Sequence, residues 1–204
     1  MDNNAFTNAA AQVNLRNAAA AAKLLGLPAN PDWALVARNI PILKMADGVT
    51  REHATYKGEG IKQGDVNLLA YPLNVITDPS QIRKDLTYYE TRVPTEGTPA
   101  MTQAIFALLY ARLGSADKAK LWFKDAYEPN LLPPFRVIAE TKGGTNPYFA
   151  TGAGGVLQAV LMGFGGLNIT PIGITQSKIT LPAGWQSVKI IGVGIGRKTF
   201  SVSR

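Results

Sequence analysis

The chain has 204 residues, of which 46% are hydrophobic and 17% are charged, so it is long and apolar enough to bury a core. It has no cysteine, which excludes disulfides and thiolate chemistry, and its single histidine, His53, excludes a histidine-rich metal site. The formal net charge is +7, but the Lys and Arg residues are scattered along the chain. We therefore expect no metal, no cofactor and no nucleic-acid partner, and keep nonspecific nucleic-acid binding as a weaker alternative.

The first third of the chain is predicted to be helical. Residues 2–27 are rich in alanine, with capping residues at the start and Gly26 before Pro28 at the end, which predicts a long helix. Residues 31–40 predict a second helix, with a proline at its first position. Residues 46–64 are charged and loop-like. They precede a predicted short helix over 65–73, which Pro72 would end.

The middle of the chain predicts three further helices. Residues 78–92 form one, with Asp78 or Ser80 as its cap. Residues 98–114 predict an amphipathic helix that ends at Gly114, and residues 115–128 follow as another helix that begins at Ser115. The apolar face expected for the 98–114 helix consists of Met101, Ile105, Leu108, Leu109 and Leu113. Such tight helix–turn–helix steps are typical of α-helical hairpins that pack side by side.

The composition changes after Gly166. The last segment is rich in Ile, Val and Thr and has turn residues at 182–184 and 194–197, which predicts three or four short antiparallel strands. We therefore predict a mainly α protein with two domains, a helical body over residues 1–166 and a small β-sheet tail over 167–204. The longest apolar run, 156–167, is too short for a membrane span, and no signal peptide is visible, so no membrane partner is expected and no compartment is indicated.

One stretch, "FRVIAETKGGTNPYFATGAGG", places a lone carboxylate, Glu140, before a glycine-rich loop and an apolar helix. The glycines allow a close approach of the backbone. Two interpretations remain open: a loop packed against a helix start, or a pocket with Glu140 on one side and the helix start on the other. "TGAGG" has no following Lys and is not a phosphate loop, and "GVGIGR" (192–197) is predicted to be a hairpin turn.

Two further segments carry polar residues of the kind that bind sugars. Lys62 and Gln63 lie just before the predicted helix at 65–73, and "YYETR" (88–92) supplies Glu90 with aromatic and basic neighbours. Amide and charged groups can bind vicinal hydroxyls, and tyrosines can form apolar walls. For each of these residues alone, a surface charge or a pair of side chains on one helix is the favoured interpretation.

Taken in order, four blocks of the chain resemble glycoside hydrolase family 65, with the strongest likeness to the branch of acid trehalases and related α-glucosidases. The blocks are "DNNAFTNAAAQVNLRNAA", "IKQGDVNLLAYPL", "YYETRVPTEGTPAMT" and "GGTNPYFATGAGGVLQAVLMGFGGL". The resemblance implies an (α/α)6 barrel, of which this chain would form a partial toroid, followed by a small β-sheet domain. It also implies inverting hydrolysis of an α-glucoside, with trehalose-, kojibiose- or glucosyl-galactose-like substrates.

The resemblance also implies roles for individual residues. Glu140 matches the general base, and Lys62, Gln63 and Glu90 match positions that hold the non-reducing glucose. The segment with Thr151, Gly152 and Gly154 would form a pocket wall. The phosphorylase branch carries a His-Asp-Ser-Ser-like block and a His/Ser-bearing loop where this chain has "RVPTEGTPAMT" and "ATGAGG", so a hydrolase is expected and a phosphorylase is the alternative. Acid trehalases often have His at the position of Ala153, which argues against trehalose.

In this family the general acid is the Glu of a Pro-Asp-Glu-Tyr-like motif just before the "DNNAFTN" block. This block begins at Asp2, so we expect the acid and the first half of the barrel to lie outside the chain and the isolated chain to be inactive. The alternative is an inactive carbohydrate-binding or assembly half-domain. A half toroid would expose apolar surface, so the expected partners are a carbohydrate, a separate N-terminal half and a second copy of the chain.

Overall fold

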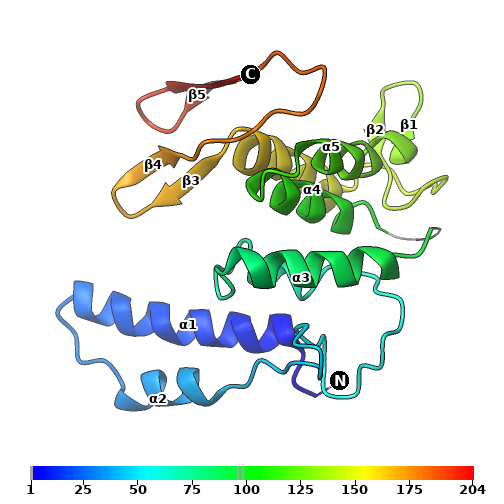
Figure 1. Cartoon of the computed structure of the whole chain (residues 1–204). Coiled ribbons are helices and arrows are strands. Elements are labelled where there is room, and N and C mark those ends of the chain that lie inside the picture. The colour runs from blue at the N-terminus through cyan, green and yellow to red at the C-terminus, as the bar shows by residue number, and fades with distance from the viewer. Residues whose placement is uncertain (1, 96, 98) are drawn as a thin grey trace. The chain divides into compact units, whose positions relative to one another are not determined.

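The structure is a computed structural model that describes residues 2–95, 97 and 99–204. Its described residues form two compact units. Unit 1 contains the residues up to Gly60 together with Asp65–Arg92, and unit 2 contains Ile61–Gly64 and the residues from Val93 to Arg204. Most of the regular structure is α-helical, and the strands lie in unit 2, mainly in the C-terminal segment (Figure 1). The chain is therefore mainly α with a β tail, as predicted.

Unit 1 begins with a helical hairpin, α1 (Ala5–Leu24) and α2 (Pro31–Asn39) (Figure 1). The side chain of Asn4 caps α1 by accepting a hydrogen bond from the backbone N–H of Thr7 at 2.9 Å. Gly26 has a φ of +66°, a left-handed conformation that ends the helix as its sequence predicts. The two predicted helices are confirmed, with α1 starting after its capping residues.

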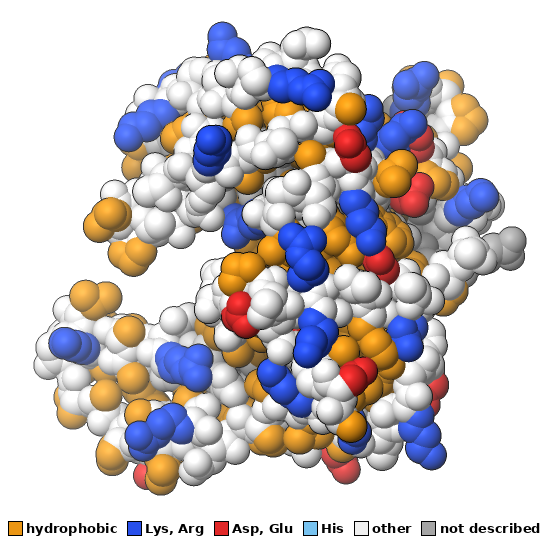
Figure 2. Space-filling model, viewed as in Figure 1, with side chains coloured by type: hydrophobic (Ala, Val, Ile, Leu, Met, Phe, Trp, Pro, Cys, Tyr) orange, Lys and Arg blue, Asp and Glu red, His pale blue; other side chains and the backbone are white. Residues whose placement is uncertain are grey.

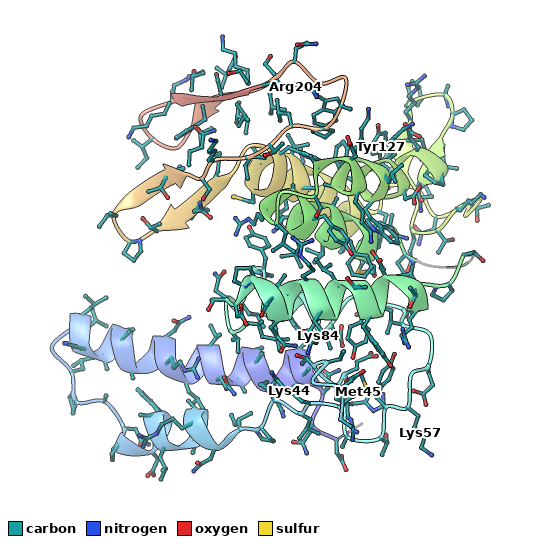
Figure 3. The ribbon with its side chains drawn as sticks, in the orientation of Figure 1. Lys44, Met45, Lys57, Lys84, Tyr127 and Arg204 are labelled. Carbon is teal, nitrogen blue, oxygen red and sulfur yellow. The ribbon has the colours of Figure 1, made fainter. Side chains whose placement is uncertain are left out.

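The first part of the predicted loop at 46–64, around Thr50, is fastened to α3 (Pro79–Tyr89) within unit 1. The buried carboxylate of Asp85 accepts hydrogen bonds from the N–H and the hydroxyl of Thr50 at 2.9 and 2.8 Å. Tyr89 donates its hydroxyl to the carbonyl of Thr50 at 2.7 Å. Nearby, Lys84 donates to the carbonyl of Asp47 at 3.1 Å, beside the loop that carries Lys44 (Figure 3). A segment without regular structure is thereby held by buried polar contacts.

Two helix predictions in unit 1 need correction. The helix expected over 78–92 is α3 followed by a short 3₁₀ helix, Glu90–Arg92, with Asp78 as the N-cap. The helix expected over 65–73 is only a 3₁₀ turn, Asn67–Leu69. Pro72 leaves too few residues ahead of it to form a full α-helix, because nucleating the first turn is costly.

Unit 2 is built around a second helical hairpin, α4 (Thr102–Arg112) and α5 (Ala116–Asp125) (Figure 1). Gly114 has a φ of +74° and turns the chain between them, as predicted. The amphipathic character expected for α4 is wrong, because the helix is buried on nearly all sides. Phe106, Ala107 and Leu108 are each 0% exposed, whereas Met101 and Leu113 of the predicted face are only partly buried. A helix that is apolar all round belongs to the interior.

The helix after the glycine-rich loop, α6 (Ala150–Gln158), continues as a π-helical segment, Ala159–Phe164. Two of its glycines, Gly155 and Gly163, face α4 at very short range. A Cβ atom built on Gly155 would lie 3.0 Å from the Cβ of Ala104, and one on Gly163 would lie 3.0 Å from the Cα of Leu108. These glycines therefore allow two helices to pack closely.

Unit 2 also contains three separate antiparallel hairpins. They are β1 (Leu131–Leu132) with β2 (Val137–Ile138), β3 (Leu167–Thr170) with β4 (Gly173–Gln176), and β5 (Ser187–Val193) with β6 (Lys198–Ser203). The predicted strands and the turn at 194–197 are confirmed, but among the described residues β3–β4 and β5–β6 do not join into one sheet. Trp185 links the tail to the helices, with its ring 4.8 Å from that of Phe164. The proposed domain boundary at residues 166/167 stays a prediction.

Within residues 2–95, 97 and 99–204, no helix combines the length and the apolar composition that a bilayer crossing requires.

Candidate functional site

The chain segment that leads into α4 holds two of the predicted site residues. The N–H of Ala100 donates a hydrogen bond to the carbonyl of Glu140 at 2.9 Å. The hydroxyl of Thr102 donates to the carbonyl of Lys62 at 3.3 Å. Ala100 and Thr102 are each only 1% exposed, so these contacts are made in the core of unit 2. The start of α4 therefore places Glu140 and Lys62 relative to each other, although 78 positions separate them in the sequence.

Glu140 is supported from two further directions. Asn130 is buried and donates its side-chain amide to the carbonyls of Ala139 and Glu140, both at 3.2 Å. Asn146 donates to the carboxylate Oε2 of Glu140 at 3.0 Å. The side chain of Glu140 is half-buried, so it is oriented and still accessible. A carboxylate that is fixed in this way and open to solvent is suited to activate a water molecule.

The loop between Glu140 and α6 ends in a residue with an unusual backbone conformation and in a backbone hydrogen bond to β2. The N–H of Phe149 donates to the carbonyl of Ile138 at 2.9 Å, which ties the start of α6 to β2. Tyr148 has a φ of +63° and is 77% exposed. A left-handed conformation is uncommon for a bulky residue, and such conformations gather at functional sites.

The glycine-rich start of α6 serves packing, at least in part. Gly152 is buried, and a Cβ atom there would lie 2.9 Å from the ring of Phe149 and 3.3 Å from the Cβ of Ala100. Thr151 and Gly154 are exposed, and nothing lies within 4 Å of a Cβ built on Gly154. The packing interpretation therefore applies to Gly152, and the role of this segment as a pocket wall stays a prediction.

The other predicted sugar-binding residues divide between the two units. Lys62 and Gln63 are exposed and belong to unit 2, with Glu140. Glu90 is half-buried and belongs to unit 1, where it follows α3 and donates its N–H to the carbonyl of Leu86. The structure thus brings Lys62 and Glu140 into one framework, and the grouping of Glu90 with them stays a prediction.

A cluster of acidic residues in unit 1 escaped the sequence analysis. Burial, with the nearby carboxylates of Asp65 and Glu59, raises the pKa of Glu52 to about 7. Residues of the same region fasten the first turn of α1. The side-chain amide of Asn4 donates to the carboxylate of Asp65 at 2.9 Å, and the N–H of Ala5 donates to the carbonyl of Glu52 at 2.8 Å. Among the described residues, no three His, Asp or Glu side chains gather in a way that would hold a metal ion.

Several positioning residues had no signal in the sequence. Ala100 and Thr102 are ordinary helix-start residues, and Asn130 lies in a short 3₁₀ turn far along the chain from Lys62. Asn146 alone had a local cue, because an Asn before a Pro favours a turn next to the candidate base.

Comparison with known proteins identifies relatives along the whole chain, although no family model matches it. It is 71% identical over 202 residues to a kojibiose hydrolase of Mucilaginibacter mallensis, which covers 99% of this chain. It is 60% identical over 201 residues to a kojibiose hydrolase of Flavobacterium johnsoniae, which covers 98%. The chain is homologous to these hydrolases.

A more distant relative is the protein-glucosylgalactosylhydroxylysine glucosidase of Gallus gallus, which is 33% identical over 211 residues and covers 100% of this chain. The chain spans 30% of the length of the two kojibiose hydrolases and 29% of the length of the glucosidase. The similarity therefore concerns less than a third of each relative.

Proposed function

We propose that the chain is the part of an inverting α-glucoside hydrolase, of glycoside hydrolase family 65, that supplies the general base and part of the glucose subsite. The proposal rests on 71% identity to a kojibiose hydrolase over 99% of the chain. The shared anchoring of Glu140 and Lys62 by the start of α4 supports it. In this proposal the helical hairpins form part of an (α/α)6 barrel.

Glu140 acts as the base in the proposed reaction. Its carboxylate removes a proton from a water molecule, which attacks the anomeric carbon on the face opposite to the leaving oxygen. Asn146 holds one carboxylate oxygen, Oε2, and leaves the other for the water. Lys62, Gln63 and Glu90 bind hydroxyl groups of the non-reducing glucose. An acid from outside this chain protonates the leaving oxygen, and the two carboxyl groups of inverting enzymes stand roughly 6.5–9.5 Å apart.

The proposed substrate is a kojibiose-like α-glucoside. The two relatives named for kojibiose are 71% and 60% identical, whereas the relative named for a glucosylgalactosyl substrate is 33% identical. Pocket residues that determine specificity diverge together with the rest of a chain, so the larger identity favours kojibiose.

The decisive experiment replaces the matching part of the Mucilaginibacter mallensis kojibiose hydrolase with these 204 residues. The chimera is expected to hydrolyse kojibiose with inversion, which ¹H NMR would detect as initial release of the β-anomer of glucose. Glu140→Gln in the chimera should lower kcat by about 10²–10⁴-fold, because the water loses its base. Glu128→Gln changes an exposed glutamate of the same unit and should leave kcat unchanged.

Retention of activity by the Glu140→Gln chimera would contradict the role of Glu140 as base. Initial release of the α-anomer would contradict inversion. The 204-residue chain alone is expected to release no glucose from kojibiose, since it would lack the acid. Sustained glucose release by the purified chain, sensitive to Glu140→Gln, would show that the acid lies within it.

A further inference from the structure

A pocket of about 290 Å³ lies in unit 2, lined by residues of α4 and α5, of the segment before α4 and of the segment after α5. Its volume is close to the lower end of the range for small-molecule sites, so it suits a ligand the size of one sugar ring. Tyr127, two residues after the end of α5, marks this end of the helix in Figure 3. The side chains that line it and carry polar or aromatic groups are Thr95, Gln103, Trp122, Asp125, Asn130 and Lys142.

The charges of the lining favour a neutral ligand. Among the lining residues that the structure describes, Asp125 supplies a carboxylate and Lys142 an ammonium group. An anion such as phosphate is usually held by several cations and avoids a carboxylate, whereas an uncharged polyol can use both groups. Asp125 is exposed, and partial desolvation together with the neighbouring carboxylate of Glu128 raises its pKa.

One lining residue, Gln103, has a polar side-chain atom without a partner. The side-chain oxygen of Gln103, Oε1, is buried and accepts no hydrogen bond within the part of the chain that the structure describes. An unpaired buried carbonyl is costly, about 1–3 kcal/mol, so a ligand that donates a hydroxyl to it recovers part of this cost. Trp122 adds a half-buried indole to the same pocket, and aromatic rings are the usual apolar surface for the C–H groups of a sugar ring.

The pocket is separate from the candidate catalytic residues. Glu140, Lys62 and Gln63 are not among its lining residues. It is nevertheless connected to the candidate base, because the pocket residue Asn130 donates to the carbonyl of Glu140 at 3.2 Å. A ligand here would lie beside Asn130, which supports the backbone of Glu140.

We propose that this pocket is a second, non-catalytic binding site for a neutral pyranose sugar. The oxygen of Gln103 and the carboxylate of Asp125 accept hydrogen bonds from its hydroxyls, Lys142 donates to one of them, and Trp122 contacts the ring. This site does not depend on the proposed catalytic function, so either proposal can fail without the other.

The test is a titration of the ¹⁵N-labelled 204-residue chain with D-glucose and with inorganic phosphate, followed by NMR. Glucose should shift the indole N–H of Trp122 and the side-chain amide of Gln103 with a Kd of roughly 1–10 mM, and phosphate should not. Gln103→Leu and Asp125→Asn should each weaken glucose binding about tenfold, because the first removes the acceptor and the second replaces one charged acceptor oxygen with a donor. Asp32→Asn, an equal change of charge in unit 1, should leave the Kd unchanged.

Lys62→Ala separates this pocket from the proposed catalytic subsite, and glucose shifts at Trp122 should persist in this variant. If the shifts disappear in Lys62→Ala and persist in Asp125→Asn, the ligand is at the catalytic subsite and the proposal is wrong. The proposal would also be overturned if the signals of Trp122 and Gln103 did not shift at glucose concentrations tenfold above the expected Kd. It would be overturned as well if phosphate shifted them and glucose did not. Asp125 is exposed, so Asp125→Asn keeps the test valid even if Gln103→Leu disturbs folding.

Discussion

Two helical hairpins of similar design have opposite environments in this protein. In α1–α2, the 20-residue α1 buries only Ala5, Ala9, Gln12 and Ala22, and Leu24 and Leu25 are 87% and 71% exposed. In α4–α5, the 11-residue α4 buries nine of its residues. Figure 2 shows the hydrophobic side chains that remain on the surface over α1–α2. The comparison teaches that α1 depends on the helix propensity of alanine and on its polar anchors, whereas α4 depends on packing.

The largest difference between the hairpins is expected for leucine-to-alanine substitutions. Leu108→Ala in α4 should lower the free energy of unfolding by about 3 kcal/mol, because the side chain is 0% exposed and its removal leaves a cavity. Leu24→Ala at the end of α1 should change it by less than about 0.5 kcal/mol. Urea denaturation followed by circular dichroism measures both. Equal effects would show that the two hairpins do not differ in packing.

The close contact of α4 with the helix after the glycine-rich loop gives the next effect. Gly163→Ala should destabilise by about 1–2 kcal/mol, because its Cβ would lie 3.0 Å from the backbone Cα of Leu108. Gly154→Ala has open space around it and should stabilise by about 0.5–1 kcal/mol through helix propensity. Thermal melts of the two variants should therefore move in opposite directions, and a stabilised Gly163→Ala would contradict the tight contact.

The anchored end of α1 should respond to pH, in contrast to α4. The pKa of Glu52 is raised from 4.5 to about 7, so the folded state binds this proton more tightly than the unfolded chain does. The resulting stabilisation is complete below pH 4.5 and is lost as the pH rises through about 7. Glu52→Gln should remove this loss and raise stability at pH 8 by about 1 kcal/mol, a modest value because solvent screens a half-exposed carboxyl group.

Hydrogen exchange of the α1 amides between pH 5 and 8, corrected for intrinsic rates, measures the effect of Glu52. Amides of α4 serve as the internal control, since the sequence of that helix contains no Asp, Glu or His. Faster opening of α1 at pH 5 than at pH 8 would reverse the predicted sign.

The smallest effect tests the role of propensity in α1. Ala20 is exposed, so Ala20→Gly should destabilise by about 0.5–1 kcal/mol through the backbone alone. Exchange of the α1 amides should quicken, while exchange in α4 should not change. A neutral result would mean that α1 is held by contacts that its exposed surface does not show.

The elements with local signals were predictable from the sequence. Asn4, Asp78 and Gly114 mark helix ends through caps and a left-handed turn, which depend on only a few neighbouring residues. The orientation of α4 was not predictable in this way, because apolar residues fill all of its sides and the choice of one face had no physical basis. The fastening of Thr50 to Asp85 depends on residues 35 positions apart, for which a single sequence has no signal.

The candidate site shows the same limit. The roles of Glu140, Lys62, Gln63 and Glu90 come from resemblance to a family. The residue types alone favoured surface charges at the last three positions. The groups that position Glu140 and Lys62 are small or ordinary, so nothing in Ala100 or Thr102 indicates their role before the chain is folded. The pocket beside α5 was likewise invisible, because its residues come from segments that are distant in the sequence.

The anchoring of the two site residues at the start of α4 uses only their main-chain carbonyl groups. Ala100 and Thr102 would donate to the same oxygens whatever side chains stood at positions 140 and 62. The main-chain atoms of residues 62 and 140 therefore set the distance between these positions, and their side chains set the chemistry. The side chain at either position can therefore be exchanged while the distance between the two backbone positions is kept. The same scaffold can be adapted to a new reaction by changing one residue at a time.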